Sequence, residues 1–110
     1  MASDREYLDY ILDQLSLAPE ITFRSMMGEY ILYTRGRVFG GIYDNRFLVK
    51  PVPAAAAMMP DAVTEIPYEG AKGMLGVTAT EDRNFLRELV MAMYEELPPP
   101  GKRKTAGKRT

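Results

Sequence analysis

The chain of 110 residues contains no cysteine and no histidine. Without cysteine it can form neither a disulfide nor a thiolate metal site, and it has no thiol nucleophile. Without histidine it lacks the commonest general base, the commonest zinc ligand and the usual serine–histidine triads. The composition therefore excludes most hydrolase and zinc chemistry, and it predicts no metal and no cofactor.

Long apolar stretches are also missing, so the sequence predicts no transmembrane helix. The opening residues, MASDREYLDY, are acidic and amphipathic, whereas a signal peptide is basic and apolar. These absences favour a reducing cytoplasm as the location. Because 46% of the residues are apolar, a chain of this length can build one hydrophobic core without disulfides or a structural metal.

The net charge of −1 hides a separation of charge along the chain. Residues 102–110, KRKTAGKRT, hold no acidic residue and five basic ones: Lys102, Arg103, Lys104, Lys108 and Arg109. The remaining nine basic and fifteen acidic residues give the rest of the chain a charge of about −6. The body of the chain is not expected to attract DNA broadly, and any affinity for nucleic acid is expected to come from the tail. The alternative is that residues 99–110, which begin within a run of prolines at residues 98–100, are a disordered and solubilising end.

Apolar residues at helical spacing predict three helices. The first has its stripe at Tyr7, Leu8, Ile11, Leu12 and Leu15, with a capping box formed by Ser3 and Glu6 and an end near Ser16. A short middle helix begins at Pro53 and runs through AAAAMM. The last is capped by Thr80, and its buried stripe is Phe85, Leu86, Leu89, Val90, Met93 and Leu97.

Residues 29–50, EYILYTRGRVFGGIYDNRFLVK, predict a three-stranded antiparallel meander. Arg35-Gly36 and Asp44-Asn45 are its two-residue turns, because Gly and Asn tolerate a positive φ. ITFRSMM before the meander predicts an edge strand, and MLGVTA after it predicts a further strand. The fold class expected is α+β with a mainly antiparallel sheet.

Two turns of this length assign the side chains of the meander to two faces. We expect helices to cover the first face: Ile31, Tyr33, Val38, Gly40, Ile42, Phe47 and Val49. The second mixes aromatic, aliphatic and basic residues: Tyr30, Leu32, Thr34, Arg37, Phe39, Gly41, Tyr43, Arg46, Leu48 and Lys50. Aromatic residues and arginine are enriched in protein interfaces. The partner or homodimer interface is therefore predicted at Tyr30, Phe39, Tyr43, Leu48, Arg37 and Arg46. Two alternatives remain open, namely cover by residues 52–73 and stacking of single-stranded nucleic acid.

The stretch FRSMMGEYILYTRGRVFGGIYDNRFLVKP, together with REYLDYILDQL, IPYEG and the last helix, resembles the N-terminal domain of the TfoX/Sxy family over residues 5–97. The most specific part of the match is Arg24, Met26, Met27 and Gly28, followed by a strand ending at Lys50; the family often has phenylalanine in place of Met27. The resemblance implies one domain at residues 1–98, with a curved antiparallel sheet packed on helices, similar to secretion-chaperone-like domains.

The resemblance also implies a function through protein contacts. The named members of the family regulate natural competence together with the cyclic-AMP receptor protein. They carry a second, helical C-terminal domain, which this chain is expected to lack. The family supplies no catalytic residue.

Other candidate sites in the sequence are weak. Arg24 is interpreted either as a partner or phosphate contact or as an ion pair with Glu29 or with an acid of the last helix. The loop at residues 68–73, YEGAKG, lacks the P-loop spacing and is expected to be a structural turn. Acid–base catalysis requires that two of Glu29, Glu65 and Glu69 meet.

Lys50 and Lys72 can act as nucleophiles only if they are desolvated. Nothing in the spacing of these groups demands catalysis, so we expect a protein that is not an enzyme. The leading hypothesis is a non-enzymatic interaction domain. The first alternative is nucleic-acid binding through the tail together with the arginines and tyrosines of the mixed sheet face, Arg37 and Arg46 among them. The second is a small-molecule enzyme or sensor with a pocket near Tyr68 and Lys72.

Overall fold

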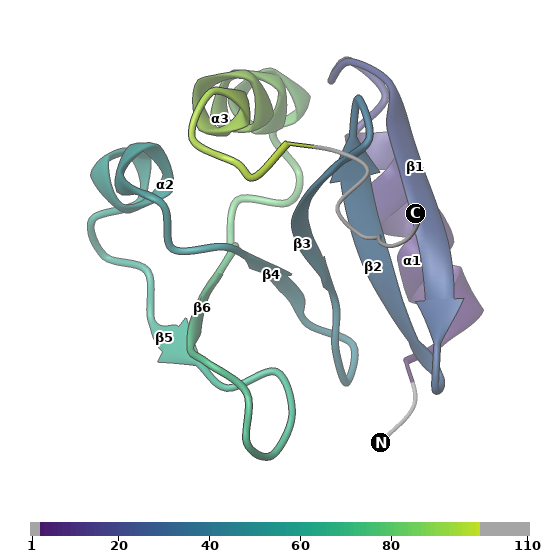
Figure 1. Ribbon diagram of the computed structural model, residues 1–110. Helices are drawn as coiled ribbons and strands as arrows, with labels where there is room; N and C mark the ends of the chain where they lie inside the picture. Colours follow the sequence, from purple (N-terminus) through teal and green to yellow (C-terminus); the bar gives the residue numbers. More distant parts are fainter. Residues whose placement is uncertain (1–2, 100–110) are drawn as a thin grey trace.

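The computed structural model describes residues 3–99 of the chain, which form an α+β fold as predicted. The sheet has six antiparallel strands in the order β1-β2-β3-β4-β6-β5 (Figure 1). The strands are β1 Ile21–Met26, β2 Glu29–Thr34, β3 Arg37–Ile42, β4 Phe47–Val49, β5 Thr64–Glu65 and β6 Met74–Gly76. The helices are α1 Arg5–Gln14, α2 Pro53–Met58 and α3 Arg83–Tyr94. All of the predicted tail except Pro99 lies outside the described residues, and so do its five basic residues.

The helices pack on one face of the sheet and enclose a single core. In Figure 1, α1 runs behind β1 and β2, and α2 and α3 lie side by side at the other end of the sheet. The core joins residues of α1 and α3 to residues of the sheet: Leu8, Ile11, Leu15, Leu86, Leu89, Val90 and Met93 pack with Leu32, Phe39, Ile42, Phe47 and Val49. Each fully buried Leu, Ile or Phe stabilises the fold by about 1.5–3 kcal/mol. The contacts between this face of the sheet and the helices therefore contribute most of the hydrophobic stabilisation.

Two-residue turns connect the first four strands. Arg35-Gly36 has φ angles of 50° and 82°, and Asp44-Asn45 has 53° and 56°, so both predicted turns are confirmed. A third turn of this kind, Met27-Gly28 with 52° and 86°, joins β1 to β2. The first four strands therefore form one continuous meander that begins at residue 21, and the predicted edge strand is its first member.

The predicted helix caps are wrong at both ends of the chain. α1 begins after Asp4, and Ser3 does not form a capping box with Glu6. The Ser3 hydroxyl instead donates to Oε1 of Glu29 at 2.5 Å. This contact is available because Glu29, at the start of β2, lies next to the turn at residues 44–45. In the same turn, the Asn45 N–H donates to Ser3 Oγ at 3.0 Å. Ser3 thus links the start of α1 to the sheet.

α3 is capped by Asp82 and not by Thr80 as predicted. The Asp82 carboxylate accepts a hydrogen bond from the N–H of Phe85 at 2.9 Å. The Thr80 carbonyl accepts from Nε2 of Gln14 at 2.9 Å, which holds this residue against α1. The helix therefore begins two residues later than predicted.

The predicted assignment of side chains to the two faces is wrong for β2 and for the first half of β3. Leu32 pairs with Gly40, Tyr33 pairs with Val38, and the register shifts between them, so Phe39 is an extra residue in a β-bulge. Tyr30 then lies opposite Ile42, not opposite Gly41. Because side chains alternate along a strand, one extra residue moves the whole of β2 to the other face relative to β4.

Candidate functional site

The predicted interface residues do not share one exposed surface, and the prediction of a mixed sheet face is wrong. Phe39 is 0% exposed and lies in the core, where its ring meets that of Phe47 edge to face. Leu48 is also 0% exposed, but on the opposite face of the sheet, where it pairs with Gly41 and Gly76. Tyr30 packs against the helix-covered core beside Phe23. The bulge places these side chains on different faces of the sheet, because it exchanges the faces of the β2 side chains relative to those of β4.

The two arginines of the predicted interface bind other parts of the same chain. Nη1 of Arg37 donates to the carbonyls of Tyr94 and Leu97 at the end of α3, at 3.0 and 3.2 Å. Nη1 of Arg46 lies 2.8 Å from Oε1 of Glu65 in β5. Both cations therefore have structural roles.

The segment between β5 and β6 covers part of the face that lacks helices, so the alternative of cover by residues 52–73 describes this region better. The Tyr68 ring lies 6.0 Å from the ring of Tyr43, which is only 6% exposed. In Figure 1 this loop projects away from the helices, below β6. The loop itself is a structural turn, as expected, with Gly70 at a φ of 87° and a hydrogen bond from the Ala71 N–H to the Tyr68 carbonyl.

Four of the five residues that carry the family resemblance meet at one end of the β1–β2 hairpin. Arg24 and Met26 lie in β1, and Met27 and Gly28 form the turn. Lys50, in contrast, follows β4. Among residues 3–99, no carboxylate forms an ion pair with Arg24, so the expected pairing with Glu29 or with α3 is absent from this part of the chain.

The carboxylates considered for catalysis are used separately. Glu29 accepts hydrogen bonds from Ser3 and from the N–H of Asp44, whereas Glu65 pairs with Arg46. Over residues 3–99, no group of three acidic side chains is arranged to hold a metal ion. Glu29 and Glu65 therefore bind different partners in the described part of the chain.

The free edge of β1 is the candidate site that the structure reveals. The Arg35 N–H donates to the Glu20 carbonyl at 3.0 Å, so Glu20, Thr22, Arg24 and Met26 direct their backbone groups toward β2. The residues between them, Ile21, Phe23 and Ser25, direct their N–H and C=O groups away from the sheet. No backbone partner from the described residues occupies these positions. The edge thus offers three donors and three acceptors in a row.

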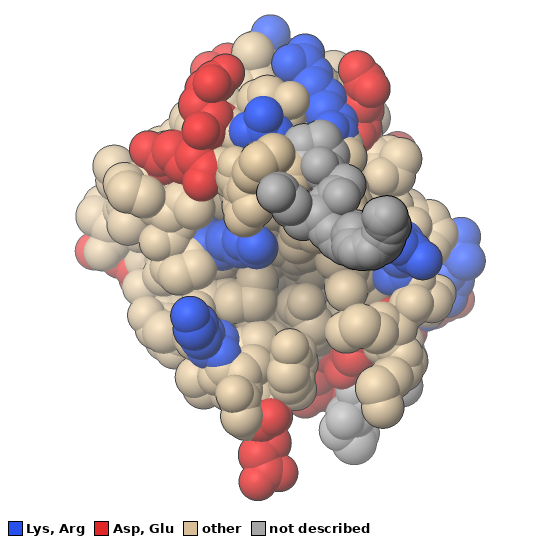
Figure 2. All heavy atoms as spheres, in the orientation of Figure 1, with Lys and Arg blue, Asp and Glu red and all other residues tan. Residues whose placement is uncertain are grey.

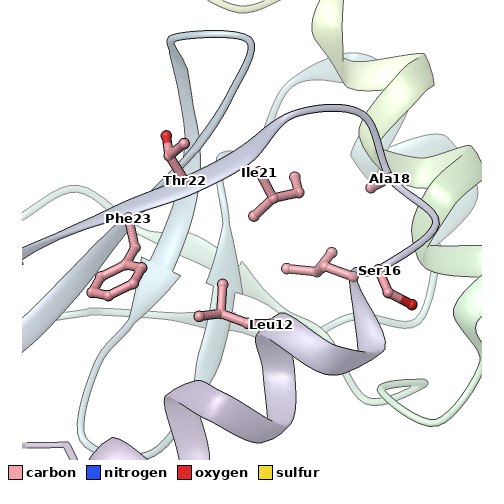
Figure 3. Close-up of a pocket in the computed structure, with 7 residues that line it drawn as sticks. Leu12, Ser16, Ala18, Ile21, Thr22 and Phe23 are labelled. Atoms are coloured by element: carbon pink, nitrogen blue, oxygen red, sulfur yellow. The ribbon is translucent and has the colours of Figure 1, made fainter.

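An open, largely apolar groove runs beside this edge, between β1 and the end of α1 (Figure 3). Its volume is about 500 Å³, and its lining includes Leu12, Leu15, Ala18, Ile21 and Phe23. Figure 3 shows the side chains of Ile21 and Phe23 directed toward α1 and that of Thr22 directed away. A strand added at the edge would therefore place alternate side chains over the groove. The predicted edge strand was the sequence signal for this site. The groove beside it could not be predicted, because it forms only when α1 packs next to β1.

Comparison with known proteins gives one informative match. A protein of Spirochaeta aurantia, described as an uncharacterized 12.7 kDa protein in the trpE 5′ region, is 31% identical over 109 residues. The match covers 98% of this chain and 95% of the spirochaete protein. The chain belongs to the family of this protein. The two proteins are therefore similar over nearly the whole of both chains.

No protein-family model and no solved structure matches the chain. The predicted resemblance to the TfoX/Sxy family is not tested by these comparisons and stays a prediction. Within residues 3–99, none of the helices has the length and apolar character needed to cross a membrane.

Proposed function

We propose that the chain is a cytoplasmic, non-enzymatic protein-interaction domain of the TfoX/Sxy N-terminal type, and that it acts through the free edge of β1. The observation that carries this proposal is the row of outward backbone groups on Ile21, Phe23 and Ser25. An exposed strand edge is a template for adding a strand from another chain. The resemblance supports the same mode of action, because it is most specific at the hairpin that contains β1.

The contrast between the two edges of the sheet supports a binding role for β1. β5, at the other edge, has two residues, and a very short strand is a common protection against unwanted pairing. β1 has six residues and contains no proline, no lysine and no bulge. Apolar side chains are exposed at its turn, with Met27 96% exposed and Met26 41% exposed.

The partner that β1 fits is a second copy of the chain. An antiparallel pair centred on Phe23 places Phe23 opposite its own copy and Ile21 opposite Ser25 of the second copy. Arg24 then lies opposite Thr22, so no two like charges face each other directly. The pairing is symmetric, as in most homodimers, and it brings the two grooves together.

The first test is the solution mass of the wild type and two variants by light scattering. Wild type is expected at twice the 12.4 kDa of one chain. Ser25→Pro is expected as a folded monomer, because proline removes an outward N–H while leaving the bonds to β2 in place. Ser25→Ala keeps this N–H and is the matched control, expected as a dimer. A wild-type monomer at about 100 μM, a concentration at which a specific dimer should persist, would exclude the second copy as partner.

A second test uses the absence of cysteine. Phe23→Cys is expected to form a disulfide between two copies, because paired residues at the centre of the contact bring their Cα atoms to about 5.5 Å. Thr22→Cys is the control, since Thr22 faces the other side of the sheet and lies opposite Arg24. Equal crosslinking of the two variants would contradict a pairing centred on Phe23.

A further inference from the structure

A cavity on the other face of the sheet has no part in the interaction through β1. It lies between β3, the segment after β4 and the loop at residues 66–73, and its volume is about 580 Å³. Figure 2 shows this face in the orientation of Figure 1, mostly tan and hollowed, with separate basic side chains at its border. Cavities of this size hold small molecules in many proteins.

Two cations line the cavity without a carboxylate partner. Lys50 and Lys72 both contribute to its wall, and neither forms an ion pair with any residue from 3 to 99. Lys50 is half-buried, and this burial lowers its pKa below the ordinary value. A half-buried ammonium has lost part of its water, and an anion placed beside it would restore the lost interaction.

Among the described residues of the wall, one is acidic, and its hydrogen bond goes to the backbone. Oε1 of Glu96 accepts a hydrogen bond from the N–H of Ala54 at 2.8 Å, at the start of α2. It therefore anchors α2 to the end of α3. Among the described lining residues, two lysines stand against this one carboxylate, so the cavity keeps a net positive charge, and neither lysine forms an ion pair with Glu96.

The rest of the wall is largely apolar and includes two aromatic rings. Tyr43 and Tyr68 contribute two rings whose centroids are 6.0 Å apart, and Val52 and Pro67 lie in the same wall. The Tyr43 ring lies directly against Gly41, where an added Cβ would come within 2.6 Å of it. Rings and prolines of this kind accept a planar apolar body in van der Waals contact.

We propose that this cavity binds a small organic carboxylate with a flat apolar body. Its carboxylate lies between Lys50 and Lys72, and its body lies against Tyr43 and Tyr68. Inorganic phosphate is a poorer occupant, because it would leave the apolar wall in contact with water. A neutral aromatic compound is also poorer, because it would leave both ammonium groups unpaired.

The experiment is a titration of the protein with 2-naphthoate, an aromatic carboxylate. Isothermal titration calorimetry measures the dissociation constant. Wild type is expected to bind 2-naphthoate at least tenfold more tightly than its neutral analogue 2-naphthamide. Lys50→Met is expected to weaken 2-naphthoate binding about tenfold and to leave 2-naphthamide binding unchanged. Lys72→Met tests the same site from the exposed side and is expected to reduce 2-naphthoate binding three- to tenfold.

Arg87→Met is the matched control, because it removes one positive charge outside the cavity wall. It is expected to change 2-naphthoate binding by less than twofold. Equal binding of 2-naphthoate and 2-naphthamide would overturn the proposal, and so would equal effects of Lys50→Met and Arg87→Met. Competition by inorganic phosphate at the same concentration as 2-naphthoate would overturn the role of the apolar wall.

Discussion

The guanidinium of Arg37 lies over the ring of Tyr94, 4.2 Å from its centroid. The same guanidinium donates two hydrogen bonds to carbonyls at the end of α3. The last carbonyls of a helix have no partner within the helix and carry partial negative charge. Arg37 therefore closes α3 with a side chain from β3, and α3 contains no basic residue in its last turn that could do so itself.

Replacement of Arg37 by methionine is expected to lower the free energy of unfolding by about 2–3 kcal/mol, because it removes two charged hydrogen bonds and a cation–π contact. Urea denaturation followed by circular dichroism measures this difference. Arg35→Met is the control, since Arg35 contacts the same ring at 5.4 Å from a more exposed turn. Equal losses in the two variants would argue against closure of α3 by Arg37.

Ser3→Ala is expected to cost about 1–2 kcal/mol, because it removes a donor to Glu29 and an acceptor for Asn45. Glu6→Gln is expected to change stability by less than about 0.5 kcal/mol, because Glu6 is exposed and makes no capping bond. Chemical denaturation of both variants separates the observed network from a capping box. A larger loss of stability for Glu6→Gln than for Ser3→Ala would support the capping box instead.

The pKa of Lys50 predicts a pH dependence of stability. Burial lowers this pKa below the 10.5 of a free lysine. At neutral pH the folded state therefore holds a desolvated charge that opposes folding. As the pH rises toward 10.5 the folded state loses this proton before the unfolded state does, so the opposition fades. Lys50→Met should be more stable than wild type at pH 7, and the difference should shrink toward pH 10.5.

Urea denaturation at several pH values measures that difference. Tyr7 and Tyr43, whose pKa values are raised by burial, act in the opposite direction in alkali, but both proteins contain them and their effect cancels. Arg87→Met supplies the reference, because a guanidinium stays charged throughout this range. A difference between wild type and Lys50→Met that is constant with pH would refute the assignment.

Gly40→Ala is expected to destabilise the fold by about 2–4 kcal/mol, because an added Cβ would lie 2.2 Å from the Leu48 carbonyl oxygen. Gly70→Ala is the comparison. At this position the space is open but φ is +87°, so the expected cost is about 1 kcal/mol. Thermal denaturation ranks the two. A Gly40→Ala protein as stable as Gly70→Ala would show that β3 and β4 can separate there without loss.

The sequence predicted the turns well because their chemistry is local. Gly36 and Asn45 stand where a positive φ is required, and this requirement depends only on the turn itself. The helical stripes were equally readable, because their spacing follows from the geometry of one helix. Leu86, Leu89, Val90 and Met93 of the predicted stripe are all buried.

The faces of the sheet could not be predicted, because they depend on one residue of register. The bulge at Phe39 is stabilised by burial of its ring against Phe47 and by close approach of β4 to Gly40, and both are tertiary contacts. The adjacent glycines Gly40 and Gly41 were the available signal, since glycine within a strand often marks a bulge. The sequence anticipated a pocket near Tyr68 and Lys72. That Lys50 also lines this pocket could not be predicted, because the fold brings it there from a distant part of the sequence.

The unequal edges of the sheet limit how far copies of this chain can assemble. A symmetric contact uses the same strand from both partners, so a pair formed through β1 has no second β1 edge left to offer. The outer ends of such a pair are two β5 strands of two residues each, too short to recruit another copy. Twelve strands would then form one continuous ribbon with a fixed length, and growth into fibres would stop at two chains.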